Sequence, residues 1–229
     1  MRPLVALLAV LVLAGCGGES EQLPQGTETV ELDAGDFTTV IDNPWWPMAP
    51  GSRWVYREGE QRVEVTVTPL TKRILGIDAR IVHDVVTEQG DVVEDTYDWY
   101  AQDDEGNVWY LGEDTKEYEA GAVSSEGSWQ AGVDGAQAGI LLPGEPKVGL
   151  AYRQEHYIGH AEDRARVLSL DERASVPYGS FDELLMTEET TPLDPGLVER
   201  KLYARELGPV LGLTVKGGSD REELLRFER

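Results

Sequence analysis

The feature of this chain that most restricts its fold is a regular alternation of short strand-like runs and turn signals. Runs rich in β-branched and aromatic residues recur along it, among them "QRVEVTVT", "ARIVHDVVTE", "DVVEDTYDWYAQD", "RARVLSL" and "LVERKLYA". Pairs that favour turns separate these runs, such as Gly59-Glu60, Gly90-Asp91, Asp171-Glu172 and Gly217-Gly218. Successive short strands joined by tight turns are typical of an antiparallel meander.

We therefore predict a mainly β fold, built as a single antiparallel meander that curves into a half-barrel or an open barrel. Residues 120–150, which contain "GVDGAQAGILLPGEPKVG", predict a long Gly/Pro-rich excursion from that sheet. Residues 37–229 are enough for one β domain with a hydrophobic core, and no second linker divides them. Only the final "SDREELLRFER" fits a helix as well as a strand.

The N-terminus, "MRPLVALLAVLVLAGCGG", has one arginine followed by an unbroken apolar run. The run from Leu4 to Ala14 is too short to cross a bilayer, which takes about 20 residues, and it suits the core of a signal peptide. It ends in Leu13-Ala14-Gly15-Cys16, which resembles the lipobox of bacterial lipoproteins. The resemblance implies that residues 1–15 are a lipoprotein signal peptide and that Cys16 becomes the lipidated N-terminus. A plain secretory signal with an incidental cysteine is the alternative.

A lipidated Cys16 would attach the protein to a membrane. Lipobox cysteines carry a thioether-linked diacylglycerol and an amide-linked fatty acid such as palmitate, and two lipid anchors are enough for stable attachment. We expect the mature protein on the extracytoplasmic face of the cell membrane or the outer membrane. The polar, acidic stretch that follows predicts a flexible tether over residues 16–36, with a reach of about 25 Å.

The chain is strongly acidic, with 43 Asp and Glu against 20 Lys and Arg, for a formal net charge of −23. Phosphate contacts need clustered basic residues, so the composition excludes nucleic acid as a partner. The same charge repels anionic lipid headgroups, so we expect the domain to stand off the bilayer. Solvated acidic faces are the preferred explanation of this charge, and an acidic binding surface is the alternative.

The stretch "DWYAQDDEGNVWYLGE" at residues 98–113 predicts a tight hairpin. Asp104-Glu105-Gly106 suits a three-residue loop whose glycine has a positive φ. The register pairs Asp103 with Asn107, Ala101 with Trp109, Tyr100 with Tyr110 and Trp99 with Leu111. Because strand side chains alternate between faces, both tryptophans share one face, which we assign to the core.

The opposite face of this hairpin is our candidate for a docking surface. It carries Glu94, Thr96, Asp98, Tyr100, Gln102, Val108, Tyr110 and Asp114. Tyrosine rings mixed with carboxylates tolerate water and still bury area when a ligand arrives. We predict that a ligand or partner docks at Asp98, Tyr100, Gln102 and Tyr110; a solvated or covered sheet face is the alternative.

Two sets of residues have the sequence spacing of metal ligands, but the backbone conformation expected around them does not suit a metal site. Asp103, Glu105, Asn107 and Asp114 match part of an EF-hand count, yet the "VWYL" between them pairs as a strand. His156 and His160 would share a helix face as zinc ligands, but a glycine and strand-like flanks argue against a helix. We therefore expect no metal site and no cofactor.

Catalytic motifs give no better candidate. The sequence has no nucleophile elbow and no phosphate-binding glycine loop, so we expect no catalytic residues. Paired carboxylates, such as Glu94 with Asp98 or Glu162 with Asp163, leave one alternative open. That alternative is a carbohydrate-active or metal-dependent enzyme that uses acidic clusters.

Several stretches together resemble a family of secreted and lipid-anchored bacterial β-proteins with no characterised activity. They are "NPWWPMAPGSRWVY", "DWYAQDDEGNVWYLGE", "GSWQAGVDGAQAGILLPGEPKVG", "YRQEHYIGHAEDRARV" and "TTPLDPGLVERKLYA". The chain departs from that pattern at "YARELGPVL", where a Pro-Gly turn is expected after Tyr-Ala. Its layout has a looser similarity to the half-barrels of lipoprotein-carrier and lipid-carrier proteins, which implies a fold and no activity.

These observations favour a membrane-anchored extracytoplasmic lipoprotein that acts as a non-catalytic binding or scaffolding module. Its expected partners are the membrane, through the lipid anchor, and a hydrophobic ligand or an envelope protein. An apolar cavity in a curved sheet would support this interpretation, whereas carboxylates that converge in a polar cleft would support the enzyme.

Overall fold

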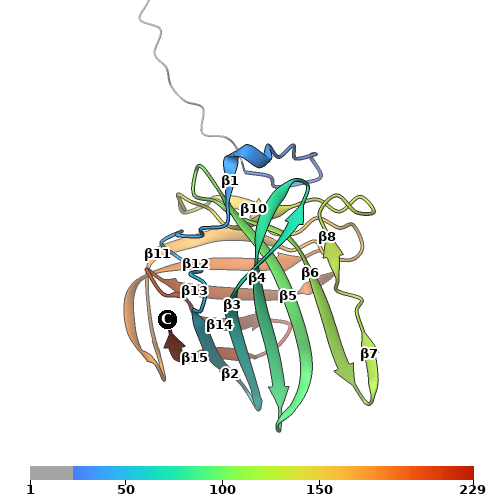
Figure 1. The fold of residues 1–229 in the computed structure, drawn as a ribbon. Coiled ribbons are helices and arrows are strands. Elements are labelled where there is room, and N and C mark those ends of the chain that lie inside the picture. The colour runs from blue at the N-terminus through green and yellow to red at the C-terminus, as the bar shows by residue number, and fades with distance from the viewer. Residues whose placement is uncertain (1–22) are drawn as a thin grey trace, which may run out of the picture.

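The strands of the computed structural model, which describes residues 23–229, belong to one curved antiparallel sheet (Figure 1). Their order in space is β10-β11-β12-β13-β14-β15-β2-β3-β4-β5-β6-β7, and the short strands β1, β8 and β9 pair beside this path. The sheet does not close into a barrel. The mainly β fold and the curved antiparallel meander predicted from the sequence are therefore confirmed.

Nine strands of the described chain form the two main groups of the sheet, β2 to β6 and β11 to β14. They are β2 (Arg53–Glu58), β3 (Gln61–Ile74), β4 (Ile77–Glu88), β5 (Asp91–Asp103), β6 (Val108–Glu119), β11 (Arg164–Val176), β12 (Gly179–Thr191), β13 (Asp194–Ala204) and β14 (Gly208–Lys216). The C-terminal strand is β15 (Arg221–Glu228), and the short strands are β1 (Phe37–Thr38), β7 (Ala122–Ser124), β8 (Trp129–Gln130), β9 (Gly139–Leu142) and β10 (Ala151–Arg153). One 3-10 turn, η1 (Ala34–Asp36), precedes β1.

Two groups of strands cross each other and enclose the interior of the fold. In Figure 1, β2 to β6 run along the molecule, and β11 to β14 lie across them. Strand β15 joins the groups because it pairs with β2, with Phe227 opposite Trp54. The C-terminal "REELLRFE" is thus a strand, and this pairing buries Trp54, Tyr56 and Leu224 in the core.

The Gly/Pro-rich segment after β6 returns to the edge of the sheet. Strands β7, β8 and β9 all pair with β6. Between β8 and β9 the segment passes close to the residues that follow β10, where Gln137 N donates to His156 O at 2.8 Å. A Cβ atom at Gly139 would lie 2.2 Å from the carbonyl oxygen of Gln154, so only glycine permits this close approach. The segment therefore lies along the β6 edge of the sheet and packs against the residues that follow β10.

The structure differs from the expected tether over residues 23–36, which lie against the domain. Arg153 N donates to Pro24 O at 2.7 Å, and Val30 N donates to the Gln137 side chain at 3.0 Å. The buried Arg153 guanidinium donates to the carbonyl oxygens of Gly26 and Glu28 at 2.7 and 2.8 Å. Composition alone missed this attachment because it rests on backbone carbonyls that accept from Arg153 and on a few scattered apolar side chains, Leu23, Val30 and Leu32, that pack against the core.

The expected signal peptide at residues 1–15, the lipidation site Cys16 and the first part of the tether lie outside the described residues. Within residues 23–229, no helix is long and apolar enough to cross a membrane.

Candidate functional site

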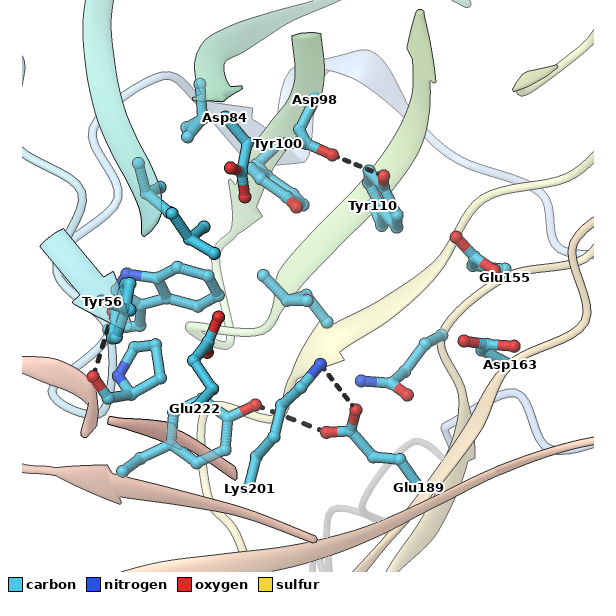
Figure 2. A pocket seen from close by; sticks show the side chains of 18 residues that line it. Tyr56, Asp84, Asp98, Tyr100, Tyr110, Glu155, Asp163, Glu189, Lys201 and Glu222 are labelled. Atoms are coloured by element: carbon cyan, nitrogen blue, oxygen red, sulfur yellow. Dashed lines mark hydrogen bonds and ion pairs between the residues drawn. The ribbon is translucent and has the colours of Figure 1, made fainter. Parts of the chain in front are cut away.

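The concave side of the sheet encloses a cavity of about 290 Å³, shown in Figure 2. Its walls come from both strand groups, from β9, from the segment between β10 and β11 and from the segment before β2. The polar and aromatic side chains that line it are Trp46, Tyr56, Asp84, Asp98, Tyr100, Tyr110, Gln154, Glu155, Asp163, Glu189, Lys201, Tyr203 and Glu222. Six of them are carboxylic acids and one is basic, so the cavity is strongly acidic.

Strands β5 and β6 supply the tyrosine wall of the cavity. Tyr100 pairs directly with Tyr110, as the hairpin predicted, and their ring centroids are 4.8 Å apart. Tyr110 Oη donates a hydrogen bond of 2.6 Å to Asp98 Oδ1. Three of the four residues that we predicted as a docking face therefore lie together on the cavity wall.

The fourth predicted residue, Gln102, does not line the cavity. Its side-chain oxygen accepts from the backbone N–H groups of Asp42 and Asn43 at 3.0 and 2.9 Å, and its amide nitrogen donates to the Asp42 carboxylate at 2.6 Å. Gln102 thus holds the segment before β2 in place. In the same segment, Trp46 reaches the cavity, with its ring 6.4 Å from the ring of Tyr100.

A β-bulge at Gly112 changes which residues of β6 face the cavity. The predicted Trp99–Leu111 pair does not form, because Asp98 pairs with Glu113 beyond the shift. A bulge adds one residue to a strand, so each side chain after it lies on the opposite face of the sheet from the one expected without the bulge. Glu113 and Thr115 therefore join the tyrosine face, where Thr96 and Thr115 hydroxyls are 2.6 Å apart, and Asp114, which we placed there, is on the other face.

The tryptophans of the hairpin are buried, as predicted, but on the outer face of the sheet. Trp99 is 5% exposed beneath Lys72, whose Nζ lies 3.1 Å from the ring centroid. Trp109 packs on Phe37 with ring centroids 6.0 Å apart, and its Nε1 donates to Asp103 at 2.7 Å. The N-terminal segment and a lysine stem thus cover the face that we assigned to the core.

Lys201 is the one basic residue among the described side chains that line the cavity. Its Nζ lies 2.9 Å from Glu189 Oε2, and Glu189 Oε1 also accepts from Thr187 at 3.0 Å. Figure 2 shows both side chains directed into the cavity from β12 and β13. The Lys201 side chain remains 42% exposed, so the cavity admits water.

Burial raises the pKa of most of the acidic groups in and beside this cavity. Desolvation raises the pKa of Asp98 to about 6, although the Tyr110 hydrogen bond lowers it. Desolvation also raises the pKa of Glu222 to about 7, of Glu155 to about 8 and of Glu113 to about 9, with neighbouring carboxylates adding to the effect in each case. For Asp84 the rise has the same two causes. Several carboxyls therefore hold protons near neutral pH.

The residues that we weighed as metal ligands are engaged elsewhere. The Asp103 carboxylate accepts hydrogen bonds from Glu105 N, Asn107 N, the Asn107 side chain and Trp109, which leaves it no room for an ion. His156 and His160 lie at a turn and not on a helix, and His160 stacks on Tyr157. Among residues 23–229, no group of three or more His, Cys, Asp or Glu side chains is arranged to hold a metal ion.

The cavity differs from the apolar one that would suit a hydrophobic ligand. Its carboxylates converge in a polar space, which is the arrangement that we expected of the enzyme alternative. One member of each acidic pair named from the sequence lines the cavity. These are Asp98, which was paired with Glu94, and Asp163, which was paired with Glu162. Glu162 instead accepts from Gly159 N at 2.8 Å and belongs to the turn before β11.

Comparison with known proteins reaches only distant structures. No protein-family model matches the chain, and no curated protein matches its sequence. A structure from Bacteroides fragilis NCTC 9343, described as an exported protein with a YmcC-like fold, aligns with a TM-score of 0.49 at 10% identity, over 81% of this chain and 99% of its own. One from Parabacteroides distasonis ATCC 8503, described as a lipoprotein, aligns with a TM-score of 0.43 at 11% identity, over 80% and 98%. Both similarities are too distant to bear on function.

Proposed function

We propose that this protein is a membrane-anchored extracytoplasmic lipoprotein whose β domain is a non-catalytic binding module, with the acidic cavity as its ligand site. The observation that carries the proposal is the cavity itself. Its volume of about 290 Å³ is near the lower end of the range for small-molecule sites. Aromatic walls combined with a few directed polar groups are typical of such sites. The polar lining indicates a hydrophilic ligand in place of the hydrophobic one expected from the sequence.

Filling the cavity should remove the ligand without unfolding the domain. Val65 lines the cavity and is 7% exposed, so Val65→Phe would place its ring in open space. Val92→Phe is the matched control, because Val92 is 44% exposed on β5. Native mass spectrometry of the purified mature proteins should show a small bound molecule on the wild type and on Val92→Phe, and none on Val65→Phe. A ligand retained by Val65→Phe would place the binding site elsewhere.

The anchor is tested separately at Cys16. If the lipobox is used, Cys16→Ser should prevent lipid attachment and release the protein into the medium or the periplasm. Gly18→Ala is the control, since it leaves Leu13 to Cys16 unchanged. Detergent phase partitioning reports the result. A Cys16→Ser variant that partitions like the wild type would show that Cys16 is not the anchor.

One observation favours a second candidate function, a carbohydrate-active enzyme. Glu222, whose burial raises its pKa to about 7, shares the cavity with Glu189, which is paired with Lys201. A general acid of raised pKa and a second carboxylate are what glycoside hydrolysis requires. A reducing-sugar assay on oligosaccharides should then show turnover that Glu222→Gln abolishes and that Glu228→Gln, on the exposed end of β15, retains. Absence of turnover by the wild type would remove this candidate.

A further inference from the structure

One carboxylate oxygen in the cavity wall has no partner. Asp84 Oδ1 is buried and accepts no hydrogen bond from any group within residues 23–229. Figure 2 shows Asp84 extending into the cavity from β4. The cavity's own cation, Lys201, is already paired with Glu189 at 2.9 Å. A buried carboxylate oxygen without a partner is unfavourable when the group is charged, so this position favours a positively charged group from outside the chain.

The surroundings of Asp84 favour a cation over another anion or an apolar group. The ionisable groups that face it are Glu94, Asp98 and Tyr100 on β5, Tyr56 on β2, Lys201 on β13 and Glu222 on β15. Burial and these carboxylates raise the pKa of Asp84 well above its ordinary value. The faces of tyrosine rings also attract cations electrostatically, and Tyr100 and Tyr110 form one wall.

The size of the cavity indicates an organic cation. At about 30 Å³ for each water-sized group, a space of about 290 Å³ takes roughly ten non-hydrogen atoms. A bare metal ion would need several ligands at short range. In the described part of the chain, no such set of His, Cys, Asp or Glu side chains is present.

We propose that the cavity binds a small organic amine in its protonated form, with the ammonium group at Asp84 and the carbon skeleton against the tyrosine wall. The assignment rests on the proposed binding function and adds the chemical class of the ligand. In the empty cavity, burial and the neighbouring carboxylates raise the pKa of Asp84 and so favour its protonated form. When the ammonium N–H groups donate to Asp84, the carboxylate form is favoured instead, and binding is then linked to proton release to the solvent.

Two pairs of probes of matched size test the charge requirement by titration calorimetry on the mature protein. Cadaverine and glucosamine carry ammonium groups, whereas 1,5-pentanediol and glucose carry hydroxyl groups in their place. We expect the two amines to bind and the two neutral probes not to bind. Titration of cadaverine, whose amines stay protonated at neutral pH, in two buffers with different ionisation enthalpies should show proton release on binding, because the ammonium favours the carboxylate form of Asp84.

Two variants that each replace one carboxyl group with an amide locate the ammonium group. Asp84→Asn should weaken amine binding by about tenfold or more and reduce the proton release. Asp104→Asn, in the exposed hairpin loop, should leave both unchanged. The Asp84→Asn variant is expected to fold, because it removes a buried ionisable group without changing side-chain size, and circular dichroism verifies this.

The possible failures are distinguishable. If glucose or pentanediol binds as tightly as its amine partner and Val65→Phe abolishes that binding, the cavity is a ligand site but the cation assignment is wrong. If amines bind equally well to Asp84→Asn, the ammonium position is wrong and the inference fails. If none of the four probes binds and no molecule is carried by the purified wild type, both the inference and the proposed function fail.

Discussion

Replacing Trp109 with alanine should lower the free energy of unfolding by about 3 to 5 kcal/mol. The side chain is only 7% exposed, although it lies on the outer face of the sheet. It packs on Phe37, and its indole N–H donates to Asp103, so truncation leaves both a void and a carboxylate short of one donor. Urea unfolding followed by circular dichroism measures the loss.

Tyr118→Ala is the matched control for Trp109→Ala. Tyr118 lies on the same strand, β6, but is 37% exposed, so its truncation should cost less than about 1 kcal/mol. Trp109→Ala should also speed proteolysis of residues 23–37, because Phe37 loses its aromatic contact. A loss of stability as small as that of Tyr118→Ala would contradict the assignment of Trp109 to a packed layer beneath the N-terminal segment.

The second large effect is on the pH dependence of stability. Burial raises the pKa of Glu113 to about 9, against an ordinary value of 4.5. Between these values the folded protein keeps a proton that the unfolded chain loses, so stability falls as pH rises, by up to about 1.4 kcal/mol for each pH unit. Glu113→Gln removes the titrating carboxyl group and, with it, this loss of stability. It should raise the free energy of unfolding by about 1 to 3 kcal/mol at pH 7 and change it little at pH 4.

Urea unfolding of the wild type and the variant at several pH values between 4 and 9 tests this. Glu117→Gln, an exposed change on the same strand, should shift stability by no more than about 0.5 kcal/mol at any pH. Because Asp98, Glu155 and Glu222 also have raised pKa values, the wild type should be more stable near pH 5 than near pH 8. Equal effects of Glu113→Gln at pH 4 and pH 7 would show that Glu113 is not the titrating group.

The fold was predictable because its signals are local. Alternating side chains and turn residues occupy neighbouring positions, so the hairpin around Gly106 and its pairs up to Tyr100 with Tyr110 followed from the sequence. The bulge at Gly112 did not, because its cause is distant in the chain. A Cβ atom at Gly112 would lie 2.3 Å from the carbonyl oxygen of Trp129, which arrives with β8.

The cavity was only partly predictable for a related reason. Asp98, Tyr100 and Tyr110 share one hairpin, and strand alternation was enough to place them on one face. Asp84, Glu189 and Glu222 reach the same space from three other strands, through pairings such as β15 with β2. Acidic residues are so frequent in this chain that an inward-facing one could not be told from a solvated one. Only the fold distinguishes them.

The attachment of residues 23–36 to the domain also determines how the molecule would stand on a bilayer. Seven peptide steps separate Cys16 from Leu23, a contour length of at most about 25 Å, whereas a free chain to Asp36 would extend to about 70 Å. With a lipid on Cys16, the end of the half-barrel that carries this segment and β1 would face the headgroups (Figure 1). The turns between β2 and β3 and between β4 and β5, at the opposite end in that view, would point away from the membrane.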